Sequence, residues 1–211
     1  MAGIDLTAWG DWSGNGRDLD SVSGTPVLVD ESGIAGIDFE NADDENLYRT
    51  TGAKNSYPFA LFAVLRFEST GGIRRIMAQH NSDARNDAHY IHQSAGIAAG
   101  ARATTDVNTP VHGDTASTVN RQVIIGRFDA DNNRTVYVDD DSTGVNSTDN
   151  AGVAEGSHAY ITVGGQWPAD PDGGYDGVIY EAGILNAWPS PYQLAQMQEY
   201  WKLRYAIPGI P

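Results

Sequence analysis

Short apolar runs separated by glycine, aspartate, asparagine, serine and threonine recur along the whole chain, and this punctuation limits the possible folds more than any other feature. Strands of about four to eight residues fit between such breaks, whereas ordinary helices need longer amphipathic stretches. We find no internal repeat, low-complexity tract or linker. The sequence therefore predicts an all-β sandwich or barrel in a single domain, residues 1–211.

The clearest predicted strand is the nearly continuous apolar run Phe59–Phe67, which is typical of a strand covered on both faces. Further strands are predicted at residues 74–78, 89–99, 123–128, 135–138, 160–163 and 177–185. The strands 123–128 and 135–138 form a hairpin around an Asp/Asn-rich turn. Alternation in the last strand predicts a common face for Val178, Tyr180, Ala182 and Ile184.

One helix is predicted near residues 191–205. Ser190 is a suitable N-cap, Pro191 suits the first helical position, and Gln193 completes a capping box. The apolar residues that follow at helical spacing are Leu194, Met197, Trp201 and Tyr205. We expect this stripe to pack on the sandwich; a contact with another molecule is the alternative.

The charge and composition of the chain limit the functions that it can have. The formal net charge is −15, from 28 acidic and 13 basic residues, which disfavours direct binding to nucleic acid. No cysteine is present, so a disulfide framework is excluded. We find no signal peptide and no run near the ~20 apolar residues of a membrane span. We expect a soluble protein without membrane insertion, which reaches any extracellular role by assembly, lysis or a non-Sec route.

Six sequence fragments, taken in order, resemble the laminin-G-like, concanavalin A-like superfamily found in bacterial and phage proteins. They are residues 12–18 (WSGNGRD), 36–39 (GIDF) with 47–48 (LY), 137–139 (YVD), 163–165 (VGG), 175–181 (YDGVIYE) and the closing helix. Asp140 departs from the pattern, because the family has glycine there, and the cysteines of animal laminin-G domains are missing. The resemblance implies an antiparallel β-sandwich of the jelly-roll type with one C-terminal helix.

The resemblance implies a fold and not a particular ligand, because this scaffold carries lectins, glycosidases and structural modules. Free-standing domains of this kind resemble bacteriophage structural proteins. The first hypothesis is therefore a virion accessory protein: a capsid decoration, a head fibre or a tail-associated protein. Such a protein would bind other virion proteins, form homo-oligomers and be assembled in the host cytoplasm. The alternative is an extracellular carbohydrate-binding, lectin-like module for adhesion or host recognition, with cell-surface glycans as partners.

Catalysis is not expected. Glycosidases that resemble this fold carry paired carboxylates on one strand face, as E-x-D-x-E or E-x-D-x-x-E, and neither pattern occurs. The nearest group is Glu40, Asp43, Asp44 and Glu45, whose spacing and neighbours are typical of a loop. A nucleophile elbow of the form G-x-S-x-G is also missing. We predict a protein that is not an enzyme.

The loop at residues 166–175 is the best candidate for a carbohydrate site. It is rich in proline and glycine, and its candidate ligand residues are Trp167, Asp170, Asp172 and Tyr175. Exposed aromatic faces stack on sugar rings, and nearby carboxylates bond the hydroxyl groups. The alternative is that Trp167 folds back and anchors the loop.

Aspartates in predicted turns offer a candidate calcium site. The oxygen donors are Asp139, Asp140, Asp141 and Asp176, which have the hardness that calcium prefers. The alternative is that they are ordinary turn residues, and no other cofactor is expected. His89 and His92 are not predicted to share a metal, because residues three apart in a strand point to opposite faces.

Overall fold

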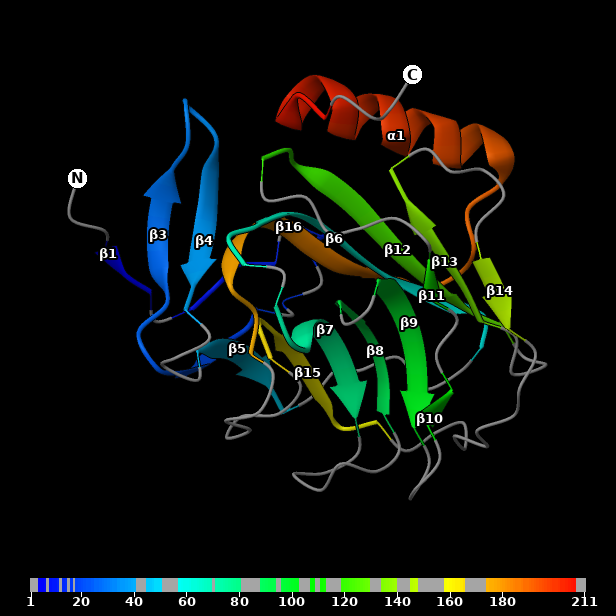
Figure 1. Ribbon diagram of the computed structural model, residues 1–211, viewed down its shortest axis with the longest axis horizontal. Helices are drawn as coiled ribbons and strands as arrows, with labels where there is room; N and C mark the ends of the chain where they lie inside the picture. Colours follow the sequence, from blue (N-terminus) through cyan, green and yellow to red (C-terminus); the bar gives the residue numbers. More distant parts are fainter. Residues whose placement is uncertain are drawn as a thin grey trace.

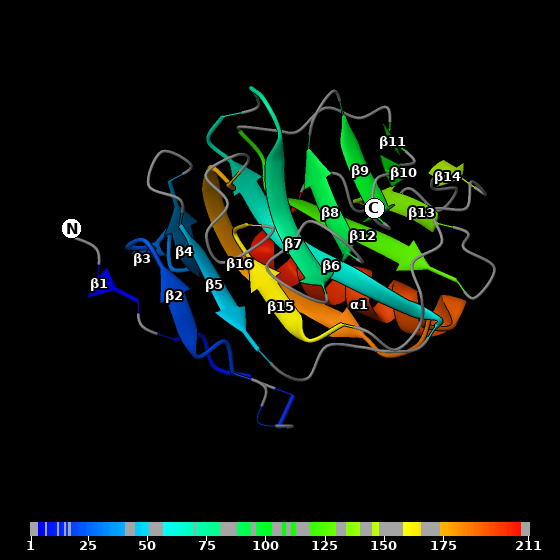
Figure 2. The ribbon, with the colours of Figure 1, turned by 90° about the horizontal axis from the view of Figure 1, so that it is seen from below.

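The computed structural model describes residues 4–6, 8–11, 13–14, 16, 18–40, 45–50, 57–69, 71–80, 88–93, 96–102, 107–108, 111–112, 119–129, 134–139, 145–147, 158–165 and 174–207. Within them, two antiparallel sheets pack face to face, and a helix covers the outer face of one sheet (Figure 1). We call the sheet beneath the helix sheet I and the other sheet II. Figure 2 shows sheet II in front, on the side away from the helix.

Both sheets draw on strands from distant parts of the chain. The order in sheet I is β1 (Ile4–Asp5), β3 (Val27–Asp30), β4 (Ala35–Phe39), β16 (Gly177–Leu185), β6 (Phe59–Phe67), β12 (Gln122–Phe128), β13 (Arg134–Val138) and β14 (Val145–Ser147). The order in sheet II is β10 (Val107–Asn108), β9 (Ile97–Arg102), β8 (Ala88–Gln93), β7 (Arg74–His80), β15 (Tyr160–Val163), β5 (Asn46–Arg49) and β2 (Ser21–Ser23), and β11 (Val111–His112) pairs with β9. The prediction of an antiparallel β-sandwich is confirmed.

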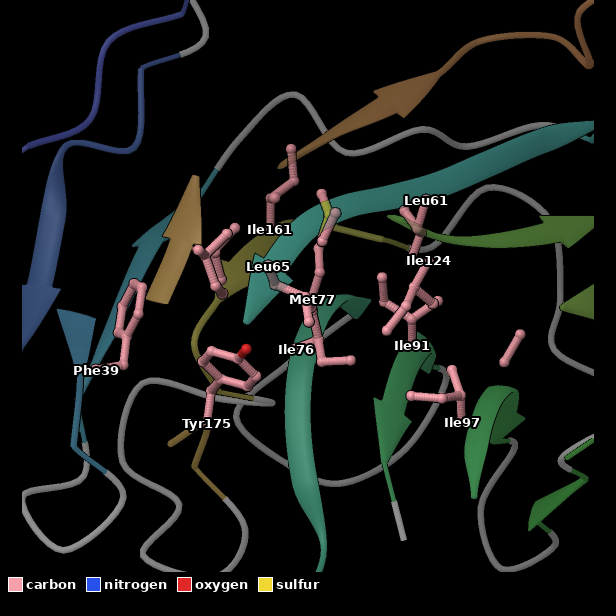
Figure 3. Packing of buried hydrophobic residues seen from close by; sticks show 14 of the residues in the cluster. Phe39, Leu61, Leu65, Ile76, Met77, Ile91, Ile97, Ile124, Ile161 and Tyr175 are labelled. Carbon is pink, nitrogen blue, oxygen red and sulfur yellow. The ribbon is translucent and has the colours of Figure 1, made fainter. Parts of the chain in front are cut away.

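The main core lies between the two sheets. Leu61 and Leu65 of β6 point inward from sheet I, and Met77 of β7 and Ile91 of β8 point inward from sheet II (Figure 3). The β6 run is almost wholly buried because the main core covers one face and the helix layer covers the other. The sequence prediction for this strand is confirmed with the same bounds.

Two strand predictions need correction. Residues 89–99 were expected to form one strand, but the structure has the separate antiparallel strands β8 and β9, with Gln93 paired to Ile97. The second correction concerns β16, where a bulge between Ile179 and Glu181 shifts the register. A bulge inserts one residue and so exchanges the two faces beyond it. The common face predicted across β16 is therefore wrong.

The helix α1 (Pro191–Tyr205) agrees with its prediction. The side chain of Ser190 accepts a hydrogen bond from the backbone N–H of Gln193, and the reciprocal bond of the capping box is present. Trp201 and Tyr205 are buried against the outer face of sheet I, with Leu194 and Met197 partly buried beside them. The predicted stripe thus packs on the sandwich. Within the described ranges, no helix has the length and apolar character to cross a membrane.

Candidate functional site

Backbone hydrogen bonds hold the two ends of the predicted sugar loop. The N–H of Tyr175 donates to the carbonyl of Gly164 at 2.7 Å, and the N–H of Gly164 donates to the carbonyl of Ile76 at 2.9 Å. Trp167, Asp170 and Asp172 fall outside the described residues. Their proposed contact with a sugar therefore stays a prediction.

Tyr175 does not have the role that the sequence predicted for it. Its side chain is 0 % exposed and lies in the main core, with Phe39 at a ring distance of 6.4 Å and Phe67 at 5.2 Å (Figure 3). Its hydroxyl donates to the carbonyl of Arg66 at 2.9 Å. Burial raises the pKa of Tyr175 well above its usual value, so it remains a hydroxyl donor. A ring enclosed in this way cannot stack on a sugar.

The predicted calcium ligands that the structure describes do not meet. Asp139 follows β13 and Asp176 precedes β16, and β6 and β12 lie between these strands in sheet I. The two strands are therefore about 14 Å apart, since neighbouring strands are spaced by about 4.8 Å. Asp139 accepts a hydrogen bond from the N–H of Val123, and Asp176 lies 3.7 Å from the guanidinium of Arg74. They cannot share an ion, which corrects the grouping; Asp140 and Asp141 are outside the described residues.

A different group of carboxylates does come together, on the outer face of sheet I. One oxygen from each of Asp38, Glu40 and Glu68 lies within 4.8 Å of the others. Burial, followed by the charges of Glu68 and Glu40, raises the pKa of Asp38 to about 6. Oδ1 of Asp38 is buried and accepts no hydrogen bond from the described residues. Such oxygens suit a hard cation, but clusters of exposed acidic groups also occur without one.

Glu45, which belongs to the acidic group nearest to a glycosidase pattern, has a structural role. It is 3 % exposed, and its carboxylate accepts hydrogen bonds from the backbone N–H groups of Thr25 and Glu40. These bonds connect the segment before β3 to the segments that follow β4 and precede β5. Asp43 and Asp44 are outside the described residues.

A polar cleft of about 670 Å³ opens beside the end of α1, lined by Asp30, Glu31, Ser32, Arg66, Val119, Asn120, Arg121 and Ala206. Glu31 sits between two arginines: Arg66 and Arg121 both donate to its carboxylate, and so does the hydroxyl of Tyr180. Burial raises the pKa of Glu31, but the hydrogen bonds from Arg66 and Tyr180, together with the charges of Arg66 and Arg121, outweigh it and the net pKa is lowered. These charged groups thus hold the turn between β3 and β4 against Arg66 of β6, Tyr180 of β16 and Arg121 before β12.

Sheet II carries a second set of aromatic and polar side chains on its outer face. Across β7 and β8, Met77 pairs with Ile91 toward the main core, so the next pair, Ala78 and Tyr90, points outward. The same alternation places further residues on this face. We define the outer face of sheet II by Asn46, Tyr48, Arg75, Ala78, His80, Ala88, Tyr90, His92, Tyr160 and Thr162.

Contacts between these side chains order the outer face of sheet II. The Arg75 guanidinium lies 4.7 Å from the centre of the Tyr90 ring and donates a hydrogen bond to His92. Burial, and then the charge of Arg75, lower the pKa of His92 to about 3, so its ring stays neutral. On the neighbouring strands, the His80 and Tyr160 rings stack in parallel at 5.0 Å.

Only part of this face is accessible. Tyr90, His80 and Thr162 are fully buried, whereas Tyr48, Arg75 and Tyr160 keep part of their surface exposed. Two partly exposed tyrosines above a polar sheet surface can stack on sugar rings, and neighbouring polar groups can bond hydroxyls. Sequence reasoning missed this site because its residues come from β5, β7, β8 and β15, which are remote from one another in the sequence.

Comparison with known proteins adds solved structures but no sequence relatives. No known protein family matches the sequence, and no curated protein matches it significantly. Domain 4 of a GH43 extracellular arabinanase from Geobacillus stearothermophilus, solved in complex with arabinotriose, gives a TM-score of 0.69 at 16 % identity and covers 93 % of this chain and 99 % of that domain.

Two further neighbours are more distant. The CBM40 of an IT-sialidase from Ruminococcus gnavus, bound to α2,3 sialyllactose, gives a TM-score of 0.55 at 11 % identity, covering 69 % of this chain and 84 % of that one. Domains LG4-5 of the mouse laminin α1 chain give 0.53 at 14 % identity, covering 71 % of this chain and 40 % of that one. The fold is the concanavalin A-like jelly roll. Likeness at these identities shows the jelly roll alone, and carbohydrate-binding modules are prominent among its neighbours.

Proposed function

We propose that this jelly roll is a non-catalytic, lectin-like module that binds carbohydrate on the outer face of sheet II. The observation that carries the proposal is the pair of partly exposed tyrosines, Tyr48 and Tyr160, which lie on the neighbouring strands β5 and β15 of that face. Aromatic rings supply the stacking surface for a sugar, and polar neighbours orient it. The solved neighbours that contain arabinotriose and sialyllactose support this class of ligand.

Binding to a panel of glycans that includes arabino-oligosaccharides and sialyllactose tests the proposal. The full chain should bind at least one glycan, and Tyr160→Ala should weaken that binding by about tenfold, since one lost stacking contact costs on the order of 1 kcal/mol. Tyr192→Ala is the matched control. Tyr192 is 72 % exposed on α1, which lies on the opposite side of the molecule, and the control should bind as the unchanged chain does.

Trp167→Ala belongs in the same experiment. A loss of binding equal to that of Tyr160→Ala would extend the site to the loop at residues 166–173. Equal binding by the Tyr160 and Tyr192 variants would move the site away from the outer face of sheet II. No binding across varied polysaccharides would remove the carbohydrate proposal altogether.

A second proposal is the virion accessory role, which the sequence resemblance favoured. It is supported by exposed apolar side chains on α1, where Leu203 is 75 % and Tyr192 72 % exposed. Such side chains can contact a virion protein. Cosedimentation of the purified chain with capsids or tails, and the loss of that association in Leu203→Asp, test it. A chain that stays monomeric at high concentration and binds neither particle would end this proposal.

A further inference from the structure

Three buried or partly buried side chains form a hydrogen-bonded chain at one end of the sandwich. Nε2 of His89 lies 2.7 Å from the hydroxyl of Tyr57, and Nδ1 of His89 lies 2.8 Å from Nε2 of His158. His89 lies on β8, Tyr57 stands just before β6, and His158 stands just before β15. Because β6 belongs to sheet I and the other two strands to sheet II, this Tyr57–His89–His158 chain joins the two sheets.

None of the described groups that act electrostatically on His89 carries a negative charge. Its side chain is 1 % exposed, and its ring meets the edges or faces of Phe59 at 5.1 Å and Phe128 at 4.8 Å. Gln79 is its neighbour on β7. The charged side chain of the described residues that acts on it is Arg134 of β13, which is 2 % exposed.

These surroundings determine the protonation state of the His89 ring. Burial, then the nearby His158 and Arg134, lower the pKa of His89 well below its usual value. A neutral imidazole has one N–H, so His89 donates one of its two hydrogen bonds and accepts the other. A second proton would place a cation in an apolar cage beside Arg134, and protonation of both histidines would set two N–H groups against each other.

We propose that the Tyr57–His89–His158 chain is an acid-sensitive latch that holds the two sheets together at this end and opens when His89 takes up a proton. The closed form binds no proton at His89, and the open form lets water reach the imidazole, which then takes up a proton with an ordinary affinity. Acid therefore favours the open form. The population of that form should rise by about tenfold for each pH unit below about 6.5.

The latch lies directly behind the outer face of sheet II. His89 precedes Tyr90, and His158 stands two residues before Tyr160, so movement of either histidine displaces an aromatic residue of that face. This consequence rests on the proposed function. If the outer face of sheet II binds a sugar, that sugar should be released as the pH falls from 7 to 5.

Hydrogen–deuterium exchange on the full chain without ligand tests the latch separately from sugar binding. After correction for intrinsic exchange, the amides of β15, Tyr57 and Phe59 should open with a slope of about one decade per pH unit between pH 6.5 and 4.5. His89→Gln should reduce that slope by one, because glutamine takes up no proton. Tyr57→Phe should raise opening at every pH and keep the slope.

His92→Gln is the matched control, since His92 is also buried on β8 but points to the opposite face. It should keep the slope at β15. If His89→Gln does not fold, titration of the unchanged chain by imidazole ¹⁵N shifts decides instead: His89 should stay neutral in the closed form down to pH 5. Ordinary titration near pH 6.5 without faster exchange, or an unchanged slope in His89→Gln, would overturn the latch. Sugar binding without release at pH 5 would remove only its link to the ligand.

Discussion

Asp38 shows how the fold alters the chemistry of one residue. Its carboxyl is partly buried beside Glu40 and Glu68, and its pKa is raised to about 6 from an unfolded value near 3.8. The folded chain therefore binds more protons than the unfolded chain between about pH 4 and pH 6. Stability at this position is lost as the pH rises through that window and is regained as it falls.

Asp38→Asn should accordingly stabilise the protein at pH 7. The amide keeps the shape and removes the repulsion, and because Asp38 is partly exposed to solvent we expect a gain on the order of 1 kcal/mol. Urea unfolding at pH 7 and pH 4 measures it. The gain should vanish at pH 4, where Asp38 is protonated; a variant that is less stable at pH 7 would show that the Asp38 carboxylate stabilises the fold.

Predictions for single residues succeeded where the backbone conformation at that residue decides its role, and failed where contacts with residues remote in sequence decide it. Gly164 was recognised within the VGG fragment, and its reason is local: its φ is +84°, a conformation that glycine adopts far more readily than other residues. Tyr175 was assigned to the surface because proline and glycine precede it. Its burial depends on Phe39 and Phe67, which lie on other strands and have no signal near residue 175.

At the scale of elements, α1 shows that local signals can set both ends of a helix. The capping box at Ser190 fixes its start, and Ala206 ends it in a left-handed conformation with φ of 52°. The sequence showed the capping box and, as a stop signal, Pro208 followed by Gly209, but it did not show the left-handed Ala206, because alanine rarely adopts that conformation.

Ser190→Ala should destabilise the protein by about 1 kcal/mol, since it leaves the N–H of Gln193 without its side-chain acceptor. In a chain of this size that corresponds to a fall in Tm of about 2–4 °C. Thermal unfolding followed by circular dichroism measures it. Gln196→Ala, at an exposed position within the same helix, is the control and should leave Tm nearly unchanged or slightly higher. An equal fall in both variants would contradict the capping argument.

The bulge in β16 is a feature that the sequence of the strand alone does not predict. Its bounds followed from its apolar alternation, but the register shift between Ile179 and Glu181 depends on pairing with β6. Val178 and Tyr180 consequently pack beneath α1, while Ala182 and Ile184 turn toward the main core. The strand β16 thus contributes side chains both to the main core and to the layer beneath α1.

At the scale of the whole molecule, the sandwich could be predicted because its strand and turn signals repeat along the chain. The candidate sites could not, because each joins residues that are remote in sequence. Tyr57, His89 and His158 meet only when both sheets are in place, and Tyr48 and Tyr160 come from two strands of sheet II that pair more than 100 residues apart.

The position of β16 has a consequence for synthesis on the ribosome. This late strand lies between β4 and β6, so until it is made these two strands have no partner on their facing edges. A nascent chain that stops before Gly177 therefore cannot close sheet I, whatever the state of its earlier strands. We expect chains stalled at that point to be cut readily by protease and chains that extend beyond α1 to resist it, so that folding waits until the last part of the chain has been translated.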